Sequence, residues 1–156
     1  MGPWPDPREE EIDMAKRMRI LMGGIECEAA LFEDKAPDTV RALWEQLPFV
    51  DRTYHVANSG QAWRTATQRP LLPVAHPVEN VADRLGAGDI IYWYKGGVNQ
   101  IVAFCYGKAR WYLPGAKPVD AALIGKIDKG LDGFVRVSSR ILYDGNLTAW
   151  FSRAEG

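Results

Sequence analysis

The hydrophobic pattern of residues 25–49 changes period once, and this change constrains the fold more than any other feature of the sequence. Apolar and polar residues alternate from Ile25 to Leu31, which is the pattern of a strand with one buried face. Apolar residues then recur at helical spacing, at Val40, Leu43, Trp44 and Leu47. Pro48 cannot continue a helix. The stretch therefore predicts a strand and then a helix over Pro37–Leu47, whose apolar stripe caps the core.

A hairpin precedes the helix. Residues 17–22 alternate in the same way as the following strand, and Gly23-Gly24 provides a two-residue turn between them. The register set by this turn places Ile20 opposite Cys27 on the core face and Arg19 opposite Glu28 on the solvent face. Because one register satisfies both faces, we expect an antiparallel pair with an opposed, exposed charge pair.

The remaining pattern predicts mostly strands. Strands are expected over residues 52–57, 61–65, 90–94, 100–106, 110–113 and 147–151, a second helix is expected over residues 131–143, and residues 121–127 are ambiguous. The stretch 90–106 is apolar on both faces, so we expect the core on one side of it and a helix or a partner on the other. Residues 66–87 form a long connection, which in a compact domain is often functional.

Residues 31–43, LFEDKAPDTVRAL, resemble the opening strand and first helix of cyclophilins. The chain is more similar still to small bacterial cyclophilin-like proteins of unknown function, with a Gly-Asp-aliphatic-aliphatic-Tyr strand at residues 88–92 and an aliphatic run that ends at Tyr106-Gly107. The resemblance covers roughly residues 17–127 with gaps. It implies a mainly β fold: a closed antiparallel cyclophilin-like β-barrel of about eight strands with two helices.

The composition suits one globular domain. The chain has 156 residues, of which 47% are hydrophobic, so it can bury a core as a single domain over residues 17–156. Residues 1–16 contain three prolines and a run of glutamates, and we expect a flexible arm there. The net charge of −1 argues against nucleic acid as a partner. The sequence has no apolar run of membrane-spanning length and no secretory pattern, so we expect a cytoplasmic protein without a membrane partner.

The sequence lacks the common motifs for metal and cofactor chemistry. Its two histidines and two cysteines lack zinc-ligand spacing, and it has neither a phosphate-binding Gly-rich loop nor a G-x-S-x-G motif. We therefore expect no metal and no cofactor. Cys27 and Cys105 lie in apolar runs and are expected to be buried, reduced thiols.

Tyr54-His55-Val56 resembles the Phe-His-Arg tripeptide of cyclophilins, whose arginine binds the prolyl carbonyl and eases rotation of the amide bond. The resemblance implies that Val56 stands at the arginine position. Valine has neither a charge nor a hydrogen-bond donor with which to stabilise a twisted amide. We expect little or no prolyl isomerase activity, while Arg52 or Arg64 leaves isomerase activity open as an alternative.

The number of aromatic residues exceeds what a small barrel needs to fill its interior, and this favours a small-molecule pocket. Aromatic walls with a few convergent polar groups are the usual form of such a pocket. The candidate ligand-binding residues are His55, Ser59, Trp63, Glu79, Asn80, Tyr92 and Tyr106. Asp89 is a further polar candidate, although an aspartate after Gly88 more often forms a turn.

A third interpretation is an interaction module, or a subunit of an amide-hydrolysing complex, because cyclophilin-like barrels resemble domains of such enzymes. The apolar hairpin over residues 90–106 would then form the interface, for example in a homodimer. A mass of about twice 17.5 kDa in solution would indicate that dimer.

Overall fold

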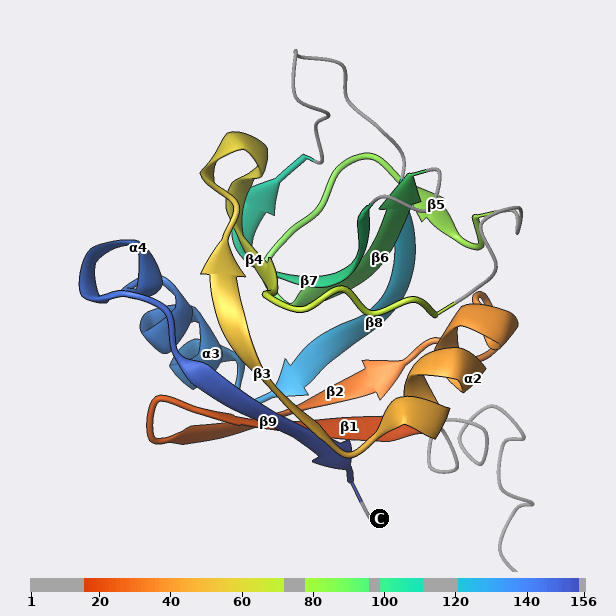
Figure 1. Cartoon of the computed structure of the whole chain (residues 1–156), viewed down its shortest axis with the longest axis horizontal. Helices are drawn as coiled ribbons and strands as arrows, with labels where there is room; N and C mark the ends of the chain where they lie inside the picture. The colour runs from red at the N-terminus through yellow and green to blue at the C-terminus, as the bar shows by residue number, and fades with distance from the viewer. Residues whose placement is uncertain (1–15, 72–77, 96–98, 111–120, 155–156) are drawn as a thin grey trace, which may run out of the picture.

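The computed structural model describes residues 16–71, 78–95, 99–110 and 121–154. Its strands are β1 (Arg17–Met22), β2 (Ile25–Leu31), β3 (Phe49–His55), β4 (Gly60–Thr65), β5 (Val81–Ala82), β6 (Asp89–Lys95), β7 (Asn99–Ala109), β8 (Ala121–Lys129) and β9 (Thr148–Arg153). They form one antiparallel sheet in the order β2-β1-β9-β3-β4-β7-β6-β8-β5, and a further pairing between β2 and β8 closes it. Because β5 pairs only with β8, the other eight strands form the closed barrel (Figure 1). The predicted fold class is confirmed.

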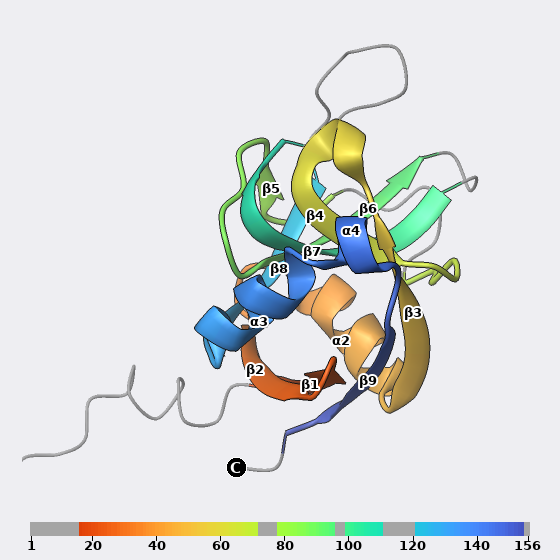
Figure 2. The ribbon, with the colours of Figure 1, turned by 90° about the vertical axis from the view of Figure 1, so that its left-hand side faces the viewer.

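Helices cover the two ends of this barrel (Figures 1 and 2). The helices are α2 (Pro37–Gln46) at one end, and α3 (Leu131–Ser138) and α4 (Ile141–Asp144) at the other. A short 3-10 turn, η1 (Ala57–Ser59), joins β3 to β4. The predicted apolar stripe of α2 is confirmed, because Val40, Leu43 and Leu47 are buried and Trp44 packs against the core.

The second helix is broken, although the sequence predicted one continuous helix over residues 131–143. α3 ends at Ser138 and α4 begins at Ile141. At the break, the Ser139 hydroxyl donates to the Arg136 carbonyl oxygen at 2.9 Å. Serine side chains compete in this way with the backbone for helical hydrogen bonds. The prediction was wrong because the apolar periodicity continues across the break and does not register it.

The N-terminal hairpin has the predicted register, with Ile20 opposite Cys27 and Arg19 opposite Glu28. Gly23 and Gly24 have φ angles of 53° and 77°, which a residue with a side chain adopts only with strain. The turn chemistry and the strand alternation therefore specify the same pairing.

The ion pairs of this hairpin run diagonally, and this differs from the opposed pair that the sequence predicted. Arg19 Nε lies 2.7 Å from Glu26 Oε1. Glu28 is instead bound by Arg17, whose guanidinium also reaches Asp128 on β8. Pairing with two carboxylates raises the pKa of Arg17. Arg17 thus pairs with both Glu28 and Asp128, and Arg19 pairs with Glu26.

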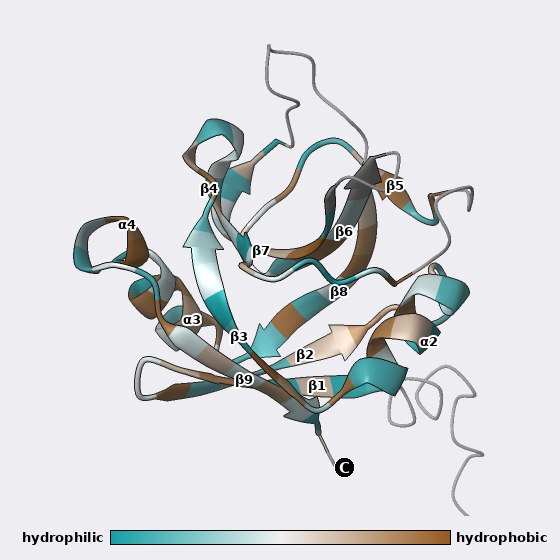
Figure 3. Ribbon diagram, viewed as in Figure 1, coloured by the Kyte–Doolittle hydropathy of each residue, from teal (hydrophilic) through white to brown (hydrophobic). Residues whose placement is uncertain are grey.

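Apolar side chains form two clusters, one inside the barrel and one on its outer wall. The first half of β8 is apolar on both faces, and polar and apolar bands alternate towards its C-terminal end (Figure 3). The inner cluster includes Met18, Ile20, Leu43, Phe104, Phe134 and Phe151. The outer cluster comprises Ala62, Leu85, Ile91, Trp93, Ile101, Ala103, Cys105, Ala109 and Ala121.

The outer face of the hairpin β6–β7 is covered in part by the chain itself, where the sequence predicted a helix or a partner. Leu85, which follows β5, is 7% exposed and belongs to the outer cluster. Its backbone pairs with Ala109 through two hydrogen bonds of 2.9 and 3.2 Å. The segment between β5 and β6 is thus laid over this wall as an irregular strap.

Both cysteines are buried thiols, as predicted. Burial raises the pKa of Cys27 and of Cys105 to about 12. Thiolate, which is the reactive form, is therefore scarce at neutral pH.

Some predictions lie partly outside the described residues. Of the expected arm over residues 1–16 only Lys16 is described, and of the expected strand over residues 110–113 only Arg110 is. The ambiguous residues 121–127 belong to β8. Across the described ranges, no helix has the length and apolar character needed to cross a membrane.

Candidate functional site

The candidate site is built on β3, whose side chains point alternately into the barrel and out to solvent. Asp51 and Thr53 are buried, and His55 is half-buried at the end of the same face. Arg52 and Tyr54 lie on the exposed face. The strand ends at His55, where η1 turns the chain into β4.

His55 and Tyr106 form the polar centre of the site. His55 Nε2 lies 2.6 Å from the Tyr106 hydroxyl oxygen, which is a short hydrogen bond. The two residues belong to β3 and β7, which do not pair with each other. β4 pairs with both strands and so brings the two side chains together.

A pocket of about 470 Å³ opens beside this pair. Its walls come from the barrel and from the α3–α4 region, and they include His55, Ala57, Gln61, Tyr106, Leu142 and Tyr143. Leu142 and Tyr143 are 57% and 76% exposed, so they form a rim rather than part of the core. The pocket thus combines a polar floor with an apolar rim.

The polar pair is neutral at physiological pH. Burial lowers the pKa of His55. Burial raises the pKa of Tyr106, and the nearby Tyr143 raises it further. His55 Nδ1 is buried and has no hydrogen-bond partner in the described part of the chain. A neutral imidazole hydrogen-bonded to a neutral phenol can hold a polar ligand or pass a proton to it.

Two further polar side chains stand at the pocket. Gln61 Oε1 accepts a hydrogen bond from the Lys108 backbone N–H at 3.1 Å. Arg140 also lines the pocket, and its Nε and Nη2 donate to the two carboxylate oxygens of Asp144 at 3.1 and 3.0 Å. The charge of this arginine is therefore already compensated.

Ser59 and Trp63, which the sequence grouped with His55, take structural positions beside it. Trp63 lies opposite His55 on β4, is fully buried, and donates its indole N–H to Ser138 Oγ at 3.0 Å. Ser59 is buried in η1, and its carbonyl oxygen accepts the Arg110 N–H at 2.9 Å. Neither residue lines the pocket.

Glu79 lies at the other end of the barrel, where it caps α2. Its carboxylate accepts the backbone N–H and the hydroxyl of Thr39, both at 2.8 Å, and the N–H of Asp38 at 3.3 Å. The first turn of α2 has no cap from its own N-terminal residue, so Glu79 satisfies N–H groups that are otherwise unpaired.

Asn80, Tyr92 and Asp89 also lie away from the pocket. Asn80 pairs with the backbone of Leu123 through hydrogen bonds of 2.7 and 3.0 Å. The Tyr92 hydroxyl accepts the Leu71 N–H at 3.1 Å inside the barrel. Asp89 accepts the Gly86 N–H at 2.8 Å, which is a turn contact. Of the seven candidates, the structure brings only His55 and Tyr106 to this pocket.

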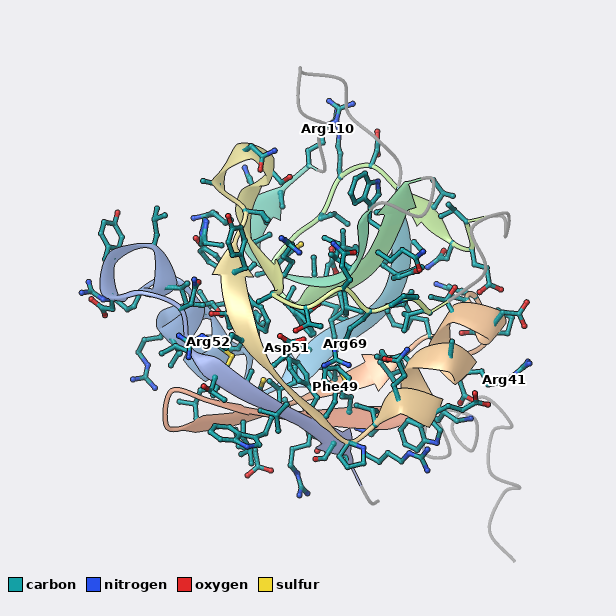
Figure 4. The ribbon with its side chains drawn as sticks, in the orientation of Figure 1. Arg41, Phe49, Asp51, Arg52, Arg69 and Arg110 are labelled. Atoms are coloured by element: carbon teal, nitrogen blue, oxygen red, sulfur yellow. The ribbon has the colours of Figure 1, made fainter. Side chains whose placement is uncertain are left out.

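A second polar cluster lies on the same face of β3, around Asp51 and Arg69 (Figure 4). Arg69 Nε and Nη2 both lie 3.1 Å from Asp51 Oδ2, and the guanidinium stacks on the Phe49 ring at 3.5 Å. The other carboxylate oxygen accepts the N–H groups of Arg52 and Thr67 at 2.8 and 3.2 Å. This cluster holds the segment after β4 against the barrel.

A larger apolar groove lies on the outer face of β1, β9 and β3, with a volume of about 850 Å³. Leu21, Trp150 and Val50 are 41%, 50% and 54% exposed. The register places Trp150 directly opposite both Leu21 and Val50, so the three side chains form one row across three strands.

The α3–α4 wall of the pocket was missed by sequence analysis. Ser139, Arg140, Leu142 and Tyr143 were interpreted as part of one amphipathic helix. Tyr143 falls off the apolar stripe of that helix, and an aromatic residue at an exposed position was the signal that could have identified the rim.

The residues in and around the tripeptide Tyr54-His55-Val56 have separate environments. Tyr54 is 50% exposed and lies under the Arg64 guanidinium, 4.7 Å from its ring centre. Val56 packs against the outer apolar cluster. Arg52 donates to the Asn146 carbonyl at 3.0 Å.

The fold and the site define a closed antiparallel β-barrel with a small pocket between its wall and the helices at one end. The chain belongs to the DUF3830 family, described as a protein of unknown function, whose model matches residues 18–153. Among curated proteins, none matches the sequence.

Two solved structures share this fold. The structure of McbB in complex with tryptophan aligns with a TM-score of 0.68 and 20% sequence identity, over 89% of this chain and 45% of McbB. The solution structure of the hypothetical protein AF2241 from Archaeoglobus fulgidus aligns with a TM-score of 0.56 and 24% identity, over 90% of this chain and 95% of that one. The chain therefore spans less than half of McbB, and at these identities the likeness shows the fold alone.

Proposed function

We propose that this protein is a cyclophilin-like barrel that binds a small molecule in the His55–Tyr106 pocket and has no prolyl isomerase activity. The observation that carries the proposal is a histidine hydrogen-bonded through one nitrogen to a pocket tyrosine, while its other nitrogen, Nδ1, is buried and has no partner among the residues that the structure describes. Buried polar atoms in native proteins are nearly always paired, so an exception calls for an explanation, and a functional role is one of them.

The size and lining of the pocket support the proposal. Small-molecule sites typically measure about 300–1,000 Å³ and carry a few convergent polar groups among apolar walls. This pocket has about 470 Å³, with His55, Gln61 and Tyr106 as polar groups and Leu142 and Tyr143 as the rim.

The positions of the arginines argue against isomerase activity. Val56 takes the place of the cyclophilin arginine in the tripeptide and packs in an apolar cluster. Arg64 is engaged with Tyr54, and Arg52 with a backbone carbonyl. Because none of these three positions offers a free guanidinium, a twisted amide lacks there a donor that is worth about 3–4 kcal/mol in comparable sites. A coupled-protease assay on an Ala-Pro peptide should show only the thermal rate, and a rate lost in Arg64→Ala would contradict this part of the proposal.

Fluorine NMR of a fragment library tests the binding proposal. Ala57→Trp places a large side chain at an exposed position of the pocket wall and should abolish fragment binding. Val81→Trp, at a position that is 51% exposed on β5, is the matched control and should bind fragments as the wild type does. A fluorinated tryptophan belongs in the library because McbB was solved with tryptophan. Binding that survives Ala57→Trp unchanged would refute the pocket as the site.

A second candidate function is self-association, and the row of Leu21, Trp150 and Val50 favours it. Contiguous exposed apolar residues often mark interaction sites. The row is symmetric in character, with an aliphatic side chain on each side of a central tryptophan. A two-fold axis near Trp150 would therefore place Trp150 against its own copy and Leu21 against Val50, which is the self-complementarity that a symmetric dimer needs.

Sedimentation equilibrium distinguishes the two oligomeric states. Self-association predicts a mass of about twice 17.5 kDa that Trp150→Lys returns to 17.5 kDa, whereas Val81→Lys leaves the dimer intact. A wild-type mass of 17.5 kDa at high protein concentration would rule out the dimer.

A further inference from the structure

We propose that the ligand of the His55–Tyr106 pocket is an uncharged carbonyl compound, such as a ketone or an amide, whose oxygen accepts a hydrogen bond from the Tyr106 hydroxyl. This inference rests on the proposed binding function and names the class of ligand. His55 is assigned a positioning role, because it fixes the direction in which the tyrosine hydroxyl donates.

One hydrogen atom lies between His55 Nε2 and the Tyr106 oxygen. Which of the two atoms donates it determines whether the Tyr106 hydroxyl can donate to a ligand. If Tyr106 donates, the single N–H of the neutral imidazole is at Nδ1, buried and without an acceptor among the residues described. If Nε2 donates instead, the buried Nδ1 is only a lone pair and the Tyr106 O–H is free to donate. Buried N–H donors without a partner are rarer in proteins than under-satisfied acceptors. The second arrangement is therefore favoured, and a hydroxyl hydrogen is available to the pocket.

Gln61 provides a second donor at the wall of the same pocket. Its Oε1 accepts the Lys108 N–H at 3.1 Å, and this contact fixes the orientation of the side-chain amide. The remaining group at the end of Gln61 is an NH₂, which only donates. Two donors at one pocket fit a carbonyl oxygen, which has two lone pairs and can accept from both.

The charge balance of the pocket favours an uncharged ligand. The cation at its wall, Arg140, is bound at two of its nitrogens by Asp144. His55 and Tyr106 contribute no charge, because burial lowers the pKa of the imidazole and raises the pKa of the phenol. A carboxylate would lose its hydration here without gaining an opposite charge, and burial of an unpaired charge is costly. A ketone or amide oxygen pays a much smaller desolvation cost.

Three fluorinated probes of similar shape separate these chemistries: para-fluoroacetophenone, para-fluoroethylbenzene and para-fluorobenzoate. The first has an uncharged carbonyl oxygen, the second has no acceptor, and the third carries a charge. In titrations followed by fluorine NMR, we expect the acetophenone to bind about five- to tenfold more tightly than the ethylbenzene, which is the typical worth of one neutral hydrogen bond. The benzoate should bind more weakly than the acetophenone.

Tyr106→Phe should remove most of the preference for the acetophenone, leaving only the part due to Gln61, and should leave the affinity for the ethylbenzene unchanged. Tyr54→Phe, which removes a hydroxyl outside the pocket, is the matched control and should keep the preference. If Tyr106→Phe does not fold, Gln61→Glu provides a second test. It retains an oxygen for Lys108 but removes the NH₂ donor, and it should reduce the preference for the acetophenone.

The outcomes distinguish this inference from the function on which it rests. If no probe or library fragment binds in an Ala57→Trp-sensitive manner, the proposed function fails and the inference fails with it. If the acetophenone and the ethylbenzene bind equally and Ala57→Trp abolishes both, the pocket binds ligands but the carbonyl assignment is overturned. If the benzoate binds most tightly, the assignment of an uncharged ligand is overturned.

Discussion

Asp51 and His55 lie on the same inward face of one strand, four positions apart, and they are partnered in opposite ways. Every oxygen of Asp51 is occupied: Oδ2 by the Arg69 guanidinium, and Oδ1 by the N–H groups of Arg52 and Thr67. His55 has one nitrogen hydrogen-bonded and the other buried without a partner in the described residues.

This difference separates a structural polar group from a candidate functional one. A fully satisfied buried network rigidifies a fold and offers nothing to a ligand. His55 is not locked into such a network, and its hydrogen bond to Tyr106 leaves the tyrosine hydroxyl able to donate to a ligand. We therefore expect substitutions at Asp51 to change the free energy of unfolding, and substitutions at His55 to change binding and its pH dependence.

The largest effect is expected for Asp51→Ala. Removing one partner of a buried ion pair leaves the other charge unpaired and typically costs about 3–5 kcal/mol. The Asp51 side chain is 3% exposed and the Arg69 side chain is 15% exposed, so the carboxylate is buried and the guanidinium is partly buried. Urea denaturation measures the loss. Asp144→Ala breaks the exposed pair with Arg140 and should change stability little. A loss below about 1 kcal/mol for Asp51→Ala would contradict the structural role of Asp51.

Leu43→Ala measures how much the loss of a buried apolar side chain lowers the free energy of unfolding, for comparison with Asp51→Ala. Leu43 is fully buried in the inner core under α2, and truncation of such a leucine costs about 2–5 kcal/mol through lost burial and a residual cavity. Urea denaturation of this variant beside Asp51→Ala shows whether the polar cluster matters as much as the core. A loss under about 0.5 kcal/mol would mean that the stripe of α2 faces solvent.

Glu79→Ala tests a satisfied polar group at the end of a helix. The loss of its hydrogen bonds to Thr39 and Asp38 should cost about 1–2 kcal/mol, the range for removal of an N-terminal cap. Glu79→Gln retains one acceptor oxygen and should lose less. Glu45→Ala, on the exposed face of the same helix, is the control. A lower melting temperature for Glu79→Gln than for Glu79→Ala would contradict the capping role.

The smallest effect on stability is expected for His55→Gln, and it should depend on pH. The pKa of His55 is lowered in the folded protein, so the unfolded chain binds more protons below its ordinary value of 6.5. The stability of the wild type should therefore fall relative to that of His55→Gln as the pH decreases from 6.5 toward the folded pKa. Above pH 6.5 the stabilities of the two proteins should run parallel. Urea titrations at several pH values measure this. A wild-type curve that rises relative to the variant on acidification would reverse the sign and the argument.

Features of the fold that depend on neighbouring residues could be predicted from the sequence, whereas contacts between distant residues could not. Alternation and Gly23-Gly24 determined the register of the first hairpin, because both act over a few residues. Glu79 caps a helix 40 residues away in the sequence, and no periodicity links the two. The break after Ser138 could not be predicted either, because the apolar stripe continues from α3 into α4.

For the candidate site, too, the types of the residues could be predicted but the contacts between them could not. His55 and Tyr106 were each candidates on chemical grounds, but their contact depends on β4 lying between their strands. Tyr92 and Trp63 are aromatic residues of the kind that line pockets, and here both are buried in the core. Residue type therefore predicted which side chains could act, whereas the strand order decided which of them meet.

The burial of both thiols has a practical consequence for work at the bench. With the pKa values of Cys27 and Cys105 at about 12, neither native cysteine should react appreciably with a maleimide or an iodoacetamide at neutral pH. A cysteine introduced at an exposed rim position such as Leu142 would then be the sole site of rapid alkylation. A fluorophore attached there would report on occupancy of the adjacent cavity, without any need to remove the two native cysteines.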